Sequence, residues 1–378
     1  MKVLFVVTHL LGTGHLSRVL TLARAFQAAG HDVEVASGGM PALHLDRGDV
    51  PLIQLPSLRS DGIDFARLLD ATGVPASEEV LQERADRLCR RLATNAPDVI
   101  ITELFPFGRR VLRAEFLALL NAAHALPRRP LICASIRDIL APPSKPEKAA
   151  RTEAILHDLY DAVLVHADPG VTALELSWPV SATLAPLLQY TGFVAPPPAL
   201  PHPNKVGNGE IIVSAGGGNV GGAIFAAALA AARLSSHRWR LLVGGKDNTE
   251  DLETLRHMAP DNVVVEHARP DFRQLLHHAA ASVSMCGYNT ALDLMQSGCR
   301  AVLVPFDAGS EVEQTLRAHA LAALPGITVL RNADLNGETL LNCLSEVLHG
   351  PAPVPMTSGF DGAGRTVQIV ADLRRGMV

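Results

Sequence analysis

Short apolar runs alternate with stretches of helical spacing along almost the whole chain. Residues 3–7 are continuously apolar, which is typical of a strand covered on both faces. From His15 to Ala29 the apolar residues recur at helical spacing, and Gly30 is a good helix end. Further strands are predicted at 32–36, 98–102, 130–135, 162–166, 210–214, 239–243, 262–266, 281–285, 301–305 and 327–330. This order predicts an α/β protein with doubly wound parallel sheets.

Two proline-rich stretches interrupt this order and suggest the domain limits. Residues 195–209 contain five prolines and two glycines, which cannot continue a strand or a helix. A chain of 378 residues is long enough for two domains. We therefore predict a first domain at 1–194, a linker at 195–209 and a second domain at 210–350. A second break at 351–355 opens a C-terminal segment, 351–378, with a helix near 364–375.

Composition narrows the class of protein. The net charge of −5 does not suggest a nucleic-acid partner. No apolar run reaches the roughly 20 residues that span a bilayer, and the apolar start reads as a strand rather than a signal peptide. The five cysteines form no CxxC pair, which favours reduced thiols in a cytoplasmic protein. The histidines are not clustered either, so we expect no metal site.

A glycine turn follows the first predicted strand and contains the first candidate for catalysis. Gly12 and Gly14 allow the backbone to approach a ligand closely, and His15 opens the next helix. The helix dipole disfavours an imidazolium there, so the ring is kept neutral and available as a base. A dinucleotide fingerprint would need a third glycine where Ser17 stands. A plain tight turn with an incidental histidine is the other alternative.

A second glycine-rich turn follows the strand that ends at Ser214. Its backbone amides suit a diphosphate, and a purely structural turn is the plainer alternative. The spacing also matches GxGxxG, but the next strand lacks the acidic end residue of a dinucleotide site. No Gly-Lys-Ser/Thr follows, which excludes a Walker loop. The predicted diphosphate-binding residues here are Gly216, Gly217, Gly218 and Asn219.

A third polar cluster begins the helix after the strand that ends at Met285. Gly287, Asn289 and Thr290 place free amides and a capping side chain at a helix start, where a phosphate can bind. Asp293 follows one turn later and can accept hydrogen bonds from two ribose hydroxyls. An ordinary acid in the first helical turn is the alternative for Asp293.

The order of these motifs resembles the GT-B glycosyltransferases, in particular the MurG-like group with a family-28 C-terminal domain. The strings that carry the resemblance are Gly12-Thr13-Gly14-His15, Ser135-Ile136-Arg137-Asp138-Ile139-Leu140, Val163-Leu164-Val165-His166-Ala167-Asp168-Pro169, Tyr190-Thr191-Gly192-Phe193-Val194, Gly216-Gly217-Gly218 and Gly287-Tyr288-Asn289-Thr290. The resemblance implies two Rossmann-like domains facing a central cleft. The first would bind the acceptor, the second the nucleotide-sugar donor, and the last helix would pack back on the first domain.

The resemblance also implies an activity. It would be transfer of a hexosyl group, with N-acetylhexosaminyl favoured, from a nucleoside diphosphate sugar, with UDP favoured, to a hydroxyl of an unknown acceptor. No Asp-x-Asp motif stands in a plausible loop, so we expect catalysis without a bound metal and no cofactor besides the nucleotide sugar. The expected location is the cytoplasm, with the inner face of the membrane as a second possibility.

Site residues follow from the same resemblance. His15 would lie beside the acceptor, and Gly14 would join the residues that bind the diphosphate. His267 and Ala268 would hold the base, and Asp293 the ribose, although relatives carry Glu at that position. Glu313 and Gln314 are expected to contact the donor sugar. The candidates on the acceptor side of the cleft are Glu103, Arg137 and Asp138.

Two alternatives to a transferase, and one alternative role for a helical stretch, remain open from the sequence. A sugar-nucleotide 2-epimerase has the same architecture, and a non-catalytic nucleotide-sugar binding protein would need no base. The third concerns residues 109–129, which mix basic and apolar positions. This pattern fits either a domain-packing helix or a helix in peripheral contact with an anionic membrane.

Overall fold

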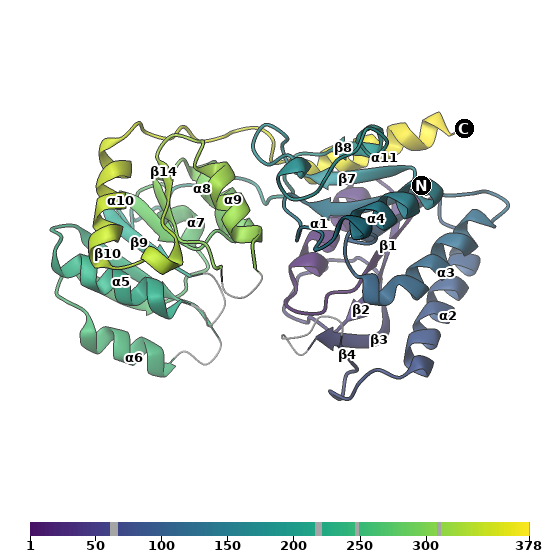
Figure 1. The fold of residues 1–378 in the computed structure, drawn as a ribbon, viewed down its shortest axis with the longest axis horizontal. Coiled ribbons are helices and arrows are strands. Elements are labelled where there is room, and N and C mark those ends of the chain that lie inside the picture. Colours follow the sequence, from purple (N-terminus) through teal and green to yellow (C-terminus); the bar gives the residue numbers. More distant parts are fainter. Residues whose placement is uncertain (61–66, 216–220, 246–248, 308–310, 378) are drawn as a thin grey trace. The chain divides into compact units, whose positions relative to one another are not determined.

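The computed structural model describes residues 1–60, 67–215, 221–245, 249–307 and 311–377 (Figure 1). The chain forms two compact units. The first contains Met1–Val194 and Gly359–Val378, and the second contains Ala195–Ser358. Each unit is built around one parallel sheet, which confirms the α/β class.

The first unit contains a sheet in the order β4-β3-β2-β1-β5-β6-β7-β8. All neighbouring strands are parallel except β3 and β4. The strands are β1 (Lys2–Val7), β2 (Asp32–Gly39), β3 (Leu52–Ser60), β4 (Leu68–Leu69), β5 (Val99–Glu103), β6 (Leu131–Arg137), β7 (Ala162–His166) and β8 (Leu188–Tyr190). Most of the predicted strands lie within one or two residues of the observed positions, and β2 continues three residues further than predicted. Strands β3, β4 and β8 were not predicted.

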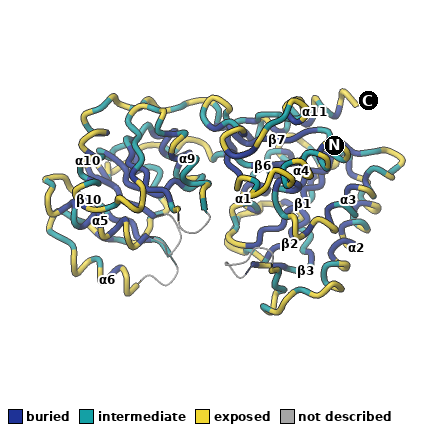
Figure 2. The backbone as a smooth tube through the Cα atoms, viewed as in Figure 1, coloured by how far each residue is buried: buried dark blue, intermediate teal, exposed yellow. Residues whose placement is uncertain are grey.

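Helices cover this sheet on both faces. They are α1 (Gly14–Ala28), α2 (Glu78–Asn95), α3 (Arg113–His124), α4 (Pro146–Leu159) and α11 (Gly362–Gly376). Helices α1 and α11 pack against each other and share one apolar core with alternate residues of β1, β5 and β6. The intervening residues of these strands are buried as well, so both faces are covered (Figure 2). This explains the unbroken apolar runs in the sequence.

The second unit contains an all-parallel sheet in the order β11-β10-β9-β12-β13-β14. The chain starts in the middle and then adds strands on each side, which is the doubly wound arrangement of a Rossmann-like fold. Its elements are β9 (Glu210–Ser214), α5 (Gly222–Arg233), β10 (Arg238–Val243), α6 (Thr249–Met258), β11 (Val263–His267), α7 (Phe272–Leu275), β12 (Ala281–Ser284), α8 (Tyr288–Ser297), β13 (Ala301–Leu303), α9 (Glu313–Leu321), β14 (Ile327–Val329) and α10 (Gly337–His349).

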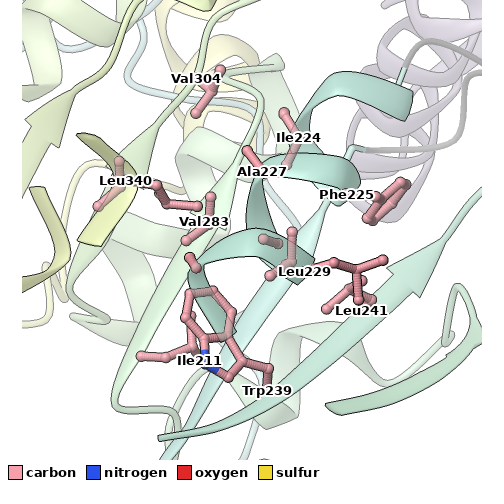
Figure 3. Packing of buried hydrophobic residues seen from close by; sticks show 14 of the residues in the cluster. Ile211, Ile224, Phe225, Ala227, Leu229, Trp239, Leu241, Val283, Val304 and Leu340 are labelled. Atoms are coloured by element: carbon pink, nitrogen blue, oxygen red, sulfur yellow. The ribbon is translucent and has the colours of Figure 1, made fainter. Parts of the chain in front are cut away.

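Alternation along the strands divides the core of the second unit between its two faces. Ile211 and Trp239 belong to the large cluster that contains α5 and α10, while Ile212 packs with Leu275 on the other face. Figure 3 shows Trp239, Leu229 and Val283 within the large cluster. The alanine-rich α5 lets helix α10 approach closely, since a Cβ at Gly337 would lie 2.8 Å from Cβ of Ala230.

The structure assigns the proline-rich stretches differently from the prediction. Residues 195–209, predicted to be a free linker, are counted with the second unit. Nε2 of His202 lies 3.2 Å from Oδ2 of Asp271, and the amide of Gly209 donates a hydrogen bond to the carbonyl of His278. Residues up to Ser358 also belong to the second unit, and Met356 N donates to Met295 O. Short irregular segments thus pack on a domain through side-chain and backbone contacts that no local pattern reveals.

Helix α3 presents its apolar side to the protein interior. Phe116, Leu119 and Leu120 are fully buried, so they are not available to a membrane surface. This argues against the membrane interpretation of residues 109–129. Among the described residues, no helix combines the length and the apolar character needed to cross a bilayer.

Candidate active site

Three polar side chains follow the carboxyl ends of neighbouring strands in the first unit. Glu103 ends β5, Ser135 lies near the end of β6 in register with it, and His166 ends β7. The residues two positions earlier in each strand belong to the core that α1 covers. Because side chains alternate between the faces of a strand, all three polar groups point toward α1.

Helix α1 begins at Gly14, directly after the glycine turn, and carries His15 and Arg18 one turn apart. Its N-cap, Thr13, makes no side-chain capping bond. Gly12 has a φ of +59°, and an added Cβ at Gly12 or Gly14 would meet no described atom within 4 Å. The described residues thus leave room around this turn, and the first amides of α1 have no acceptor within the helix, as expected where a ligand approaches the backbone.

His15 and Glu103 form a hydrogen-bonded pair at this helix start. Nδ1 of His15 lies 2.8 Å from Oε1 of Glu103, and their side chains are 16% and 1% exposed. Arg18 also binds Oε1, while Ser135 Oγ donates to Oε2 at 2.8 Å. Since a carboxylate only accepts hydrogen bonds, Nδ1 carries the imidazole proton. The lone pair of the ring is consequently on Nε2.

The hydrogen-bonded chain continues from Glu103 across the sheet. Ser135 Oγ lies 3.0 Å from Nε2 of His166, and Nδ1 of His166 lies 2.9 Å from Oγ1 of Thr191. Because Ser135 donates its only proton to Glu103, its oxygen accepts from Nε2–H of His166. The donors of this chain thus point toward Glu103. Such a buried, satisfied network fixes the carboxylate, and with it the orientation of the His15 ring.

Burial sets the protonation of these groups. It lowers the pKa of His15 to about 4, although Glu103 acts in the opposite direction. Burial also lowers the pKa of His166 to about 3. For Glu103, burial alone would raise the pKa, but Arg18, His15 and Ser135 together lower it to about 2. The ring of His15 is therefore neutral and Glu103 ionised at neutral pH. The pKa of His15 is lowered, as the sequence predicts, but the main cause is burial and not the helix dipole.

The structure changes the role of one predicted residue and adds three. Glu103, predicted to face the acceptor, is buried and fully engaged with His15, Arg18 and Ser135. Sequence reasoning missed Arg18, Ser135 and His166 as parts of this site. A signal existed, because Arg18 lies at i+3 from His15 and the other two end predicted strands. Which of these side chains contact one another depends on the order of the strands in the sheet.

The two remaining first-unit candidates lie just beyond Ser135. Asp138 is 1% exposed, and Nε of Arg137 donates to the carbonyl of Ile139 at 3.1 Å. Arg137 is also in register with His166. Burial of the Asp138 carboxyl weakens its assignment as a direct contact to the acceptor.

In the second unit, helix α8 begins immediately after β12. Its N-cap, Gly287, makes no side-chain capping bond, and an added Cβ there would meet no described atom within 4 Å. Asn289 is exposed and Thr290 half-buried in the first turn. The first amides of a helix have no acceptor within the helix itself, and a helix start of this kind is the arrangement expected for a phosphate site.

A buried arginine supports this helix start from behind. Arg317 is 2% exposed and donates to the Cys286 carbonyl at 3.1 Å. Its guanidinium carbon lies 5.9 Å from the ring centre of Tyr288, within cation–π range. Arg317 thereby links α9 to the turn at Gly287 and acts as a structural residue.

Asp293 is already paired on one side. Its Oδ1 accepts from Nε of Arg273 at 2.7 Å, and Arg273 also donates to Gln296 and to the carbonyl of Pro197. Burial raises the pKa of Asp293 to about 6, with Arg273 acting in the opposite direction. Of the two carboxylate oxygens, Oδ2 is therefore the one that could receive a ribose hydroxyl.

A cavity of about 540 Å³ lies beside the loop after β11 and is lined by His267, Ala268 and their neighbours. His267 is exposed. The amide of Ala268 donates to the Val243 carbonyl at 2.9 Å, so its own carbonyl is the backbone group left for a nucleobase. This cavity lies at the loop predicted from the sequence to hold the nucleobase. Because the amide of Ala268 is already used, the loop offers the base one backbone donor fewer than expected.

Helix α9 starts with the two residues predicted to grip the donor sugar. Oε1 of Gln314 accepts from Phe306 N at 3.2 Å, so one end of this amide closes the loop and its NH₂ group remains for a ligand. The Glu313 amide donates to the Glu311 side chain at 2.8 Å. Both predicted residues are half-buried in the first turn of the helix.

Four predicted diphosphate-binding residues, Gly216, Gly217, Gly218 and Asn219, lie outside the described residues. None of the five cysteines, all of which lie in the described ranges, is part of a disulfide, and Cys133, Cys286 and Cys299 are buried. Across the described ranges, no group of three or more His, Cys, Asp or Glu side chains could hold a metal ion.

Known proteins resemble parts of this chain in sequence. Residues 224–367 match the glycosyltransferase family 28 C-terminal domain. A UDP-N-acetylglucosamine–N-acetylmuramyl-(pentapeptide) pyrophosphoryl-undecaprenol N-acetylglucosamine transferase of Brucella suis is 30% identical over 141 residues, which is 36% of this chain and 37% of the relative. The same enzyme of Levilactobacillus brevis is 29% identical over 122 residues, 30% of this chain and 34% of that enzyme. The chain thus matches little more than a third of the length of these relatives.

Solved structures resemble the whole chain. MurG of Acinetobacter baumannii has a TM-score of 0.63 at 16% identity, covering 100% of this chain and 99% of MurG. The calicheamicin glycosyltransferase CalG4 has a TM-score of 0.64 at 17% identity, covering 98% of both chains. The glycosyltransferase VinC, solved with dTDP, has a TM-score of 0.60 at 17% identity and covers 100% of this chain and 98% of VinC. The chain therefore has the GT-B fold, and its residues 224–367 are similar to the glycosyltransferase family 28 C-terminal domain.

Proposed function

We propose that this protein transfers a hexosyl group from a nucleoside diphosphate sugar to a hydroxyl acceptor. His15 is the proposed base: Nε2 takes the hydroxyl proton as the acceptor oxygen forms its bond to the anomeric carbon. The bond from that carbon to the diphosphate breaks, and the nucleoside diphosphate leaves. UDP is the proposed nucleotide and N-acetylhexosamine the proposed sugar, because the Brucella and Levilactobacillus relatives are named for UDP-N-acetylglucosamine.

The observation that carries this proposal is the pair of His15 and Glu103 at the start of α1. A neutral imidazole with its lone pair on Nε2 and a buried carboxylate on Nδ1 is the arrangement of a general base. It lies beside a glycine turn around which the described residues leave room. A protein that only binds nucleotide sugars would have no use for a base held in this way.

The donor would be held in the second unit. The N-terminal amides of α8 near Gly287, Asn289 and Thr290 would stabilise the charge that develops on the leaving diphosphate. Because preorganised amides and a helix start can neutralise this charge, we propose that the reaction needs no bound metal. His267, Ala268, Asp293, Glu313 and Gln314 remain the proposed contacts to base, ribose and sugar.

A ligand panel followed by product analysis tests the activity. The full chain is first screened for thermal stabilisation by UDP, dTDP and their sugar conjugates, since a bound ligand stabilises by mass action. It is then incubated with UDP-N-acetylglucosamine and a library of hydroxyl compounds, with and without a chelator. A new glycoside with release of UDP supports the proposal. Release of N-acetylmannosamine would indicate a 2-epimerase, and binding without turnover would indicate a binding protein.

The rate of transfer should depend on pH through His15. A base works only when unprotonated, and burial lowers the pKa of His15 from 6.5 to about 4. We therefore expect kcat to be flat from pH 7 down to about 5 and to fall as the pH drops through about 4. Measurement at saturating donor is needed, because Asp293 titrates near pH 6. Circular dichroism at each pH excludes acid unfolding, and half-maximal kcat near pH 6.5 would contradict a buried, neutral His15.

Substitution of Asp293 by asparagine tests ribose recognition. Asn keeps the shape but loses the charge that a pair of hydroxyls would bind. We expect UDP to bind about 3- to 10-fold more weakly, the range of one hydrogen bond, and 2′-deoxy-UDP to lose less. Calorimetry with both nucleotides measures this difference. An equal loss for both would mean that Asp293 serves only to hold Arg273.

A further inference from the structure

Arg109 brings a second guanidinium close to His15. It ends the loop that follows β5. Burial is the main cause of the lowered pKa of His9 and of His15, and the charge of Arg109 acts in the same direction on both. Its backbone has a φ of 56°, and Leu104 at the start of the same loop has a φ of 71°. Residues other than glycine rarely adopt this left-handed conformation, and such strain is concentrated at functional sites. The buried Phe105 and Phe107 anchor the loop between them.

The guanidinium of Arg109 is fixed at one end. Its Nε donates to the Thr8 carbonyl at 2.6 Å, at the end of β1. In the part of the chain that the structure describes, neither Nη1 nor Nη2 of Arg109 has a hydrogen bond or an ion pair. Arg109 is half-buried. The planar fork is thus held in place while four of its N–H donors are unused.

Among the residues that the structure describes, the charges around His15 do not balance. Arg18 and Arg109 are both cationic, whereas the carboxylate acting on them is that of Glu103. Glu103 is already bound to Arg18, His15 and Ser135. Burial lowers the pKa of Arg109 to about 10, so it remains charged at neutral pH. A partly desolvated cation without a partner is costly, and an anion in front of it would relieve that cost.

We propose that Arg109 binds an anionic group of the acceptor, a carboxylate or a phosphate ester close to the reacting hydroxyl. The inference rests on the proposed function, because it places the acceptor at His15. An arginine fork binds both kinds of anion through two parallel hydrogen bonds. Such a contact would orient the hydroxyl toward Nε2 of His15. The acceptor class would then be hydroxy acids or phosphorylated alcohols rather than neutral sugars.

Binding of simple anions tests this proposal without turnover. The full chain, saturated with UDP, is titrated with inorganic phosphate and with acetate by calorimetry or NMR. Arg109→Gln removes the charge but keeps an amide that can donate to Thr8. Arg110→Gln is the matched control, since Arg110 is the neighbouring residue and is exposed. We expect the first variant to bind the preferred anion at least about 10-fold more weakly, as for a charged hydrogen bond, and the control to match wild type.

Further arms identify the source of the anion. Arg109→Lys should restore most of the affinity, which shows that charge and not loop damage is responsible. Stronger binding of phosphate or of acetate assigns the ester or the carboxylate. If Arg109→Gln weakens UDP binding instead, the guanidinium serves the donor diphosphate and the proposal is wrong. Equal anion affinity of wild type and variant, including none in either, also overturns it. Anion binding that depends on Arg109 without any glycosyl transfer would refute the proposed function alone.

Discussion

Replacement of His15 by alanine is expected to lower kcat by about 10²- to 10⁴-fold while the affinity for the donor stays within about 3-fold. The imidazole is the one group at the glycine turn with a neutral, proton-accepting nitrogen beside a fixed carboxylate among the described residues. Its loss removes proton abstraction, whereas the proposed donor contacts lie in the second unit. Steady-state kinetics and nucleotide titration separate these two effects.

The matched control is His157→Ala. His157 is exposed on α4 in the same unit and should leave both quantities unchanged. His15→Ala leaves Arg18 as the partner of Glu103, so the fold should persist, which circular dichroism checks. Turnover within a few-fold of wild type in folded His15→Ala would show that another group accepts the proton.

Replacement of Glu103 by glutamine is the second large effect we expect, and it acts on both stability and rate. It removes the buried carboxylate that faces Arg18, so the free energy of unfolding should fall by about 3 kcal/mol, as for broken buried ion pairs. The carboxylate of Glu103 accepts hydrogen bonds through both oxygens, whereas a glutamine amide has only one accepting oxygen. Either His15 or Ser135 therefore loses its acceptor. With the ring tautomer no longer fixed, kcat should fall by about 10²-fold or more.

Chemical denaturation and kinetics on the folded variant distinguish the two effects. Glu83→Gln is the control, because Glu83 pairs with Arg87 in the same unit and their side chains are 48% and 45% exposed. An exposed pair contributes only about 0–1 kcal/mol, so this control should be nearly silent in both assays. Glu103→Asp keeps the charge and should retain more activity than the glutamine variant. Wild-type kcat in folded Glu103→Gln would contradict a positioning role for the carboxylate.

The central strands of both sheets could be predicted because their apolar character is visible in a few consecutive residues. A strand covered on both faces is apolar over most of its length, and β1, β5, β7 and β9 show this pattern directly, with their polar residues at the strand ends. Helix α2 was missed for the opposite reason. Its buried stripe includes Arg84, which is fully buried through hydrogen bonds to Glu115, Thr8 and two carbonyl groups. A charged residue in a core position becomes intelligible only with its distant partner.

The candidate site divides in the same way. The sequence placed His15 at a glycine turn and at a helix start, because turn geometry and capping depend on a few adjacent residues. It also placed Gly287, Asn289 and Thr290 at the start of α8. It could not show that Asp293 is held by Arg273, since the two residues lie on different helices.

The sequence by itself thus determined the doubly wound order, the glycine turns and the histidine that follows the first of them, because each depends on contacts within one or two turns of chain. Only the tertiary structure decided that Glu103, Ser135 and His166 form one network behind His15. Each of these three residues is more than thirty positions from the next in the sequence, and the order of the strands brings them to one edge of the sheet. The sharing of the one described carboxylate, that of Glu103, between Arg18 and Arg109 is likewise a property of the assembled cluster. Local propensity carries no information about it, since electrostatic partners are chosen by distance in space and not along the chain.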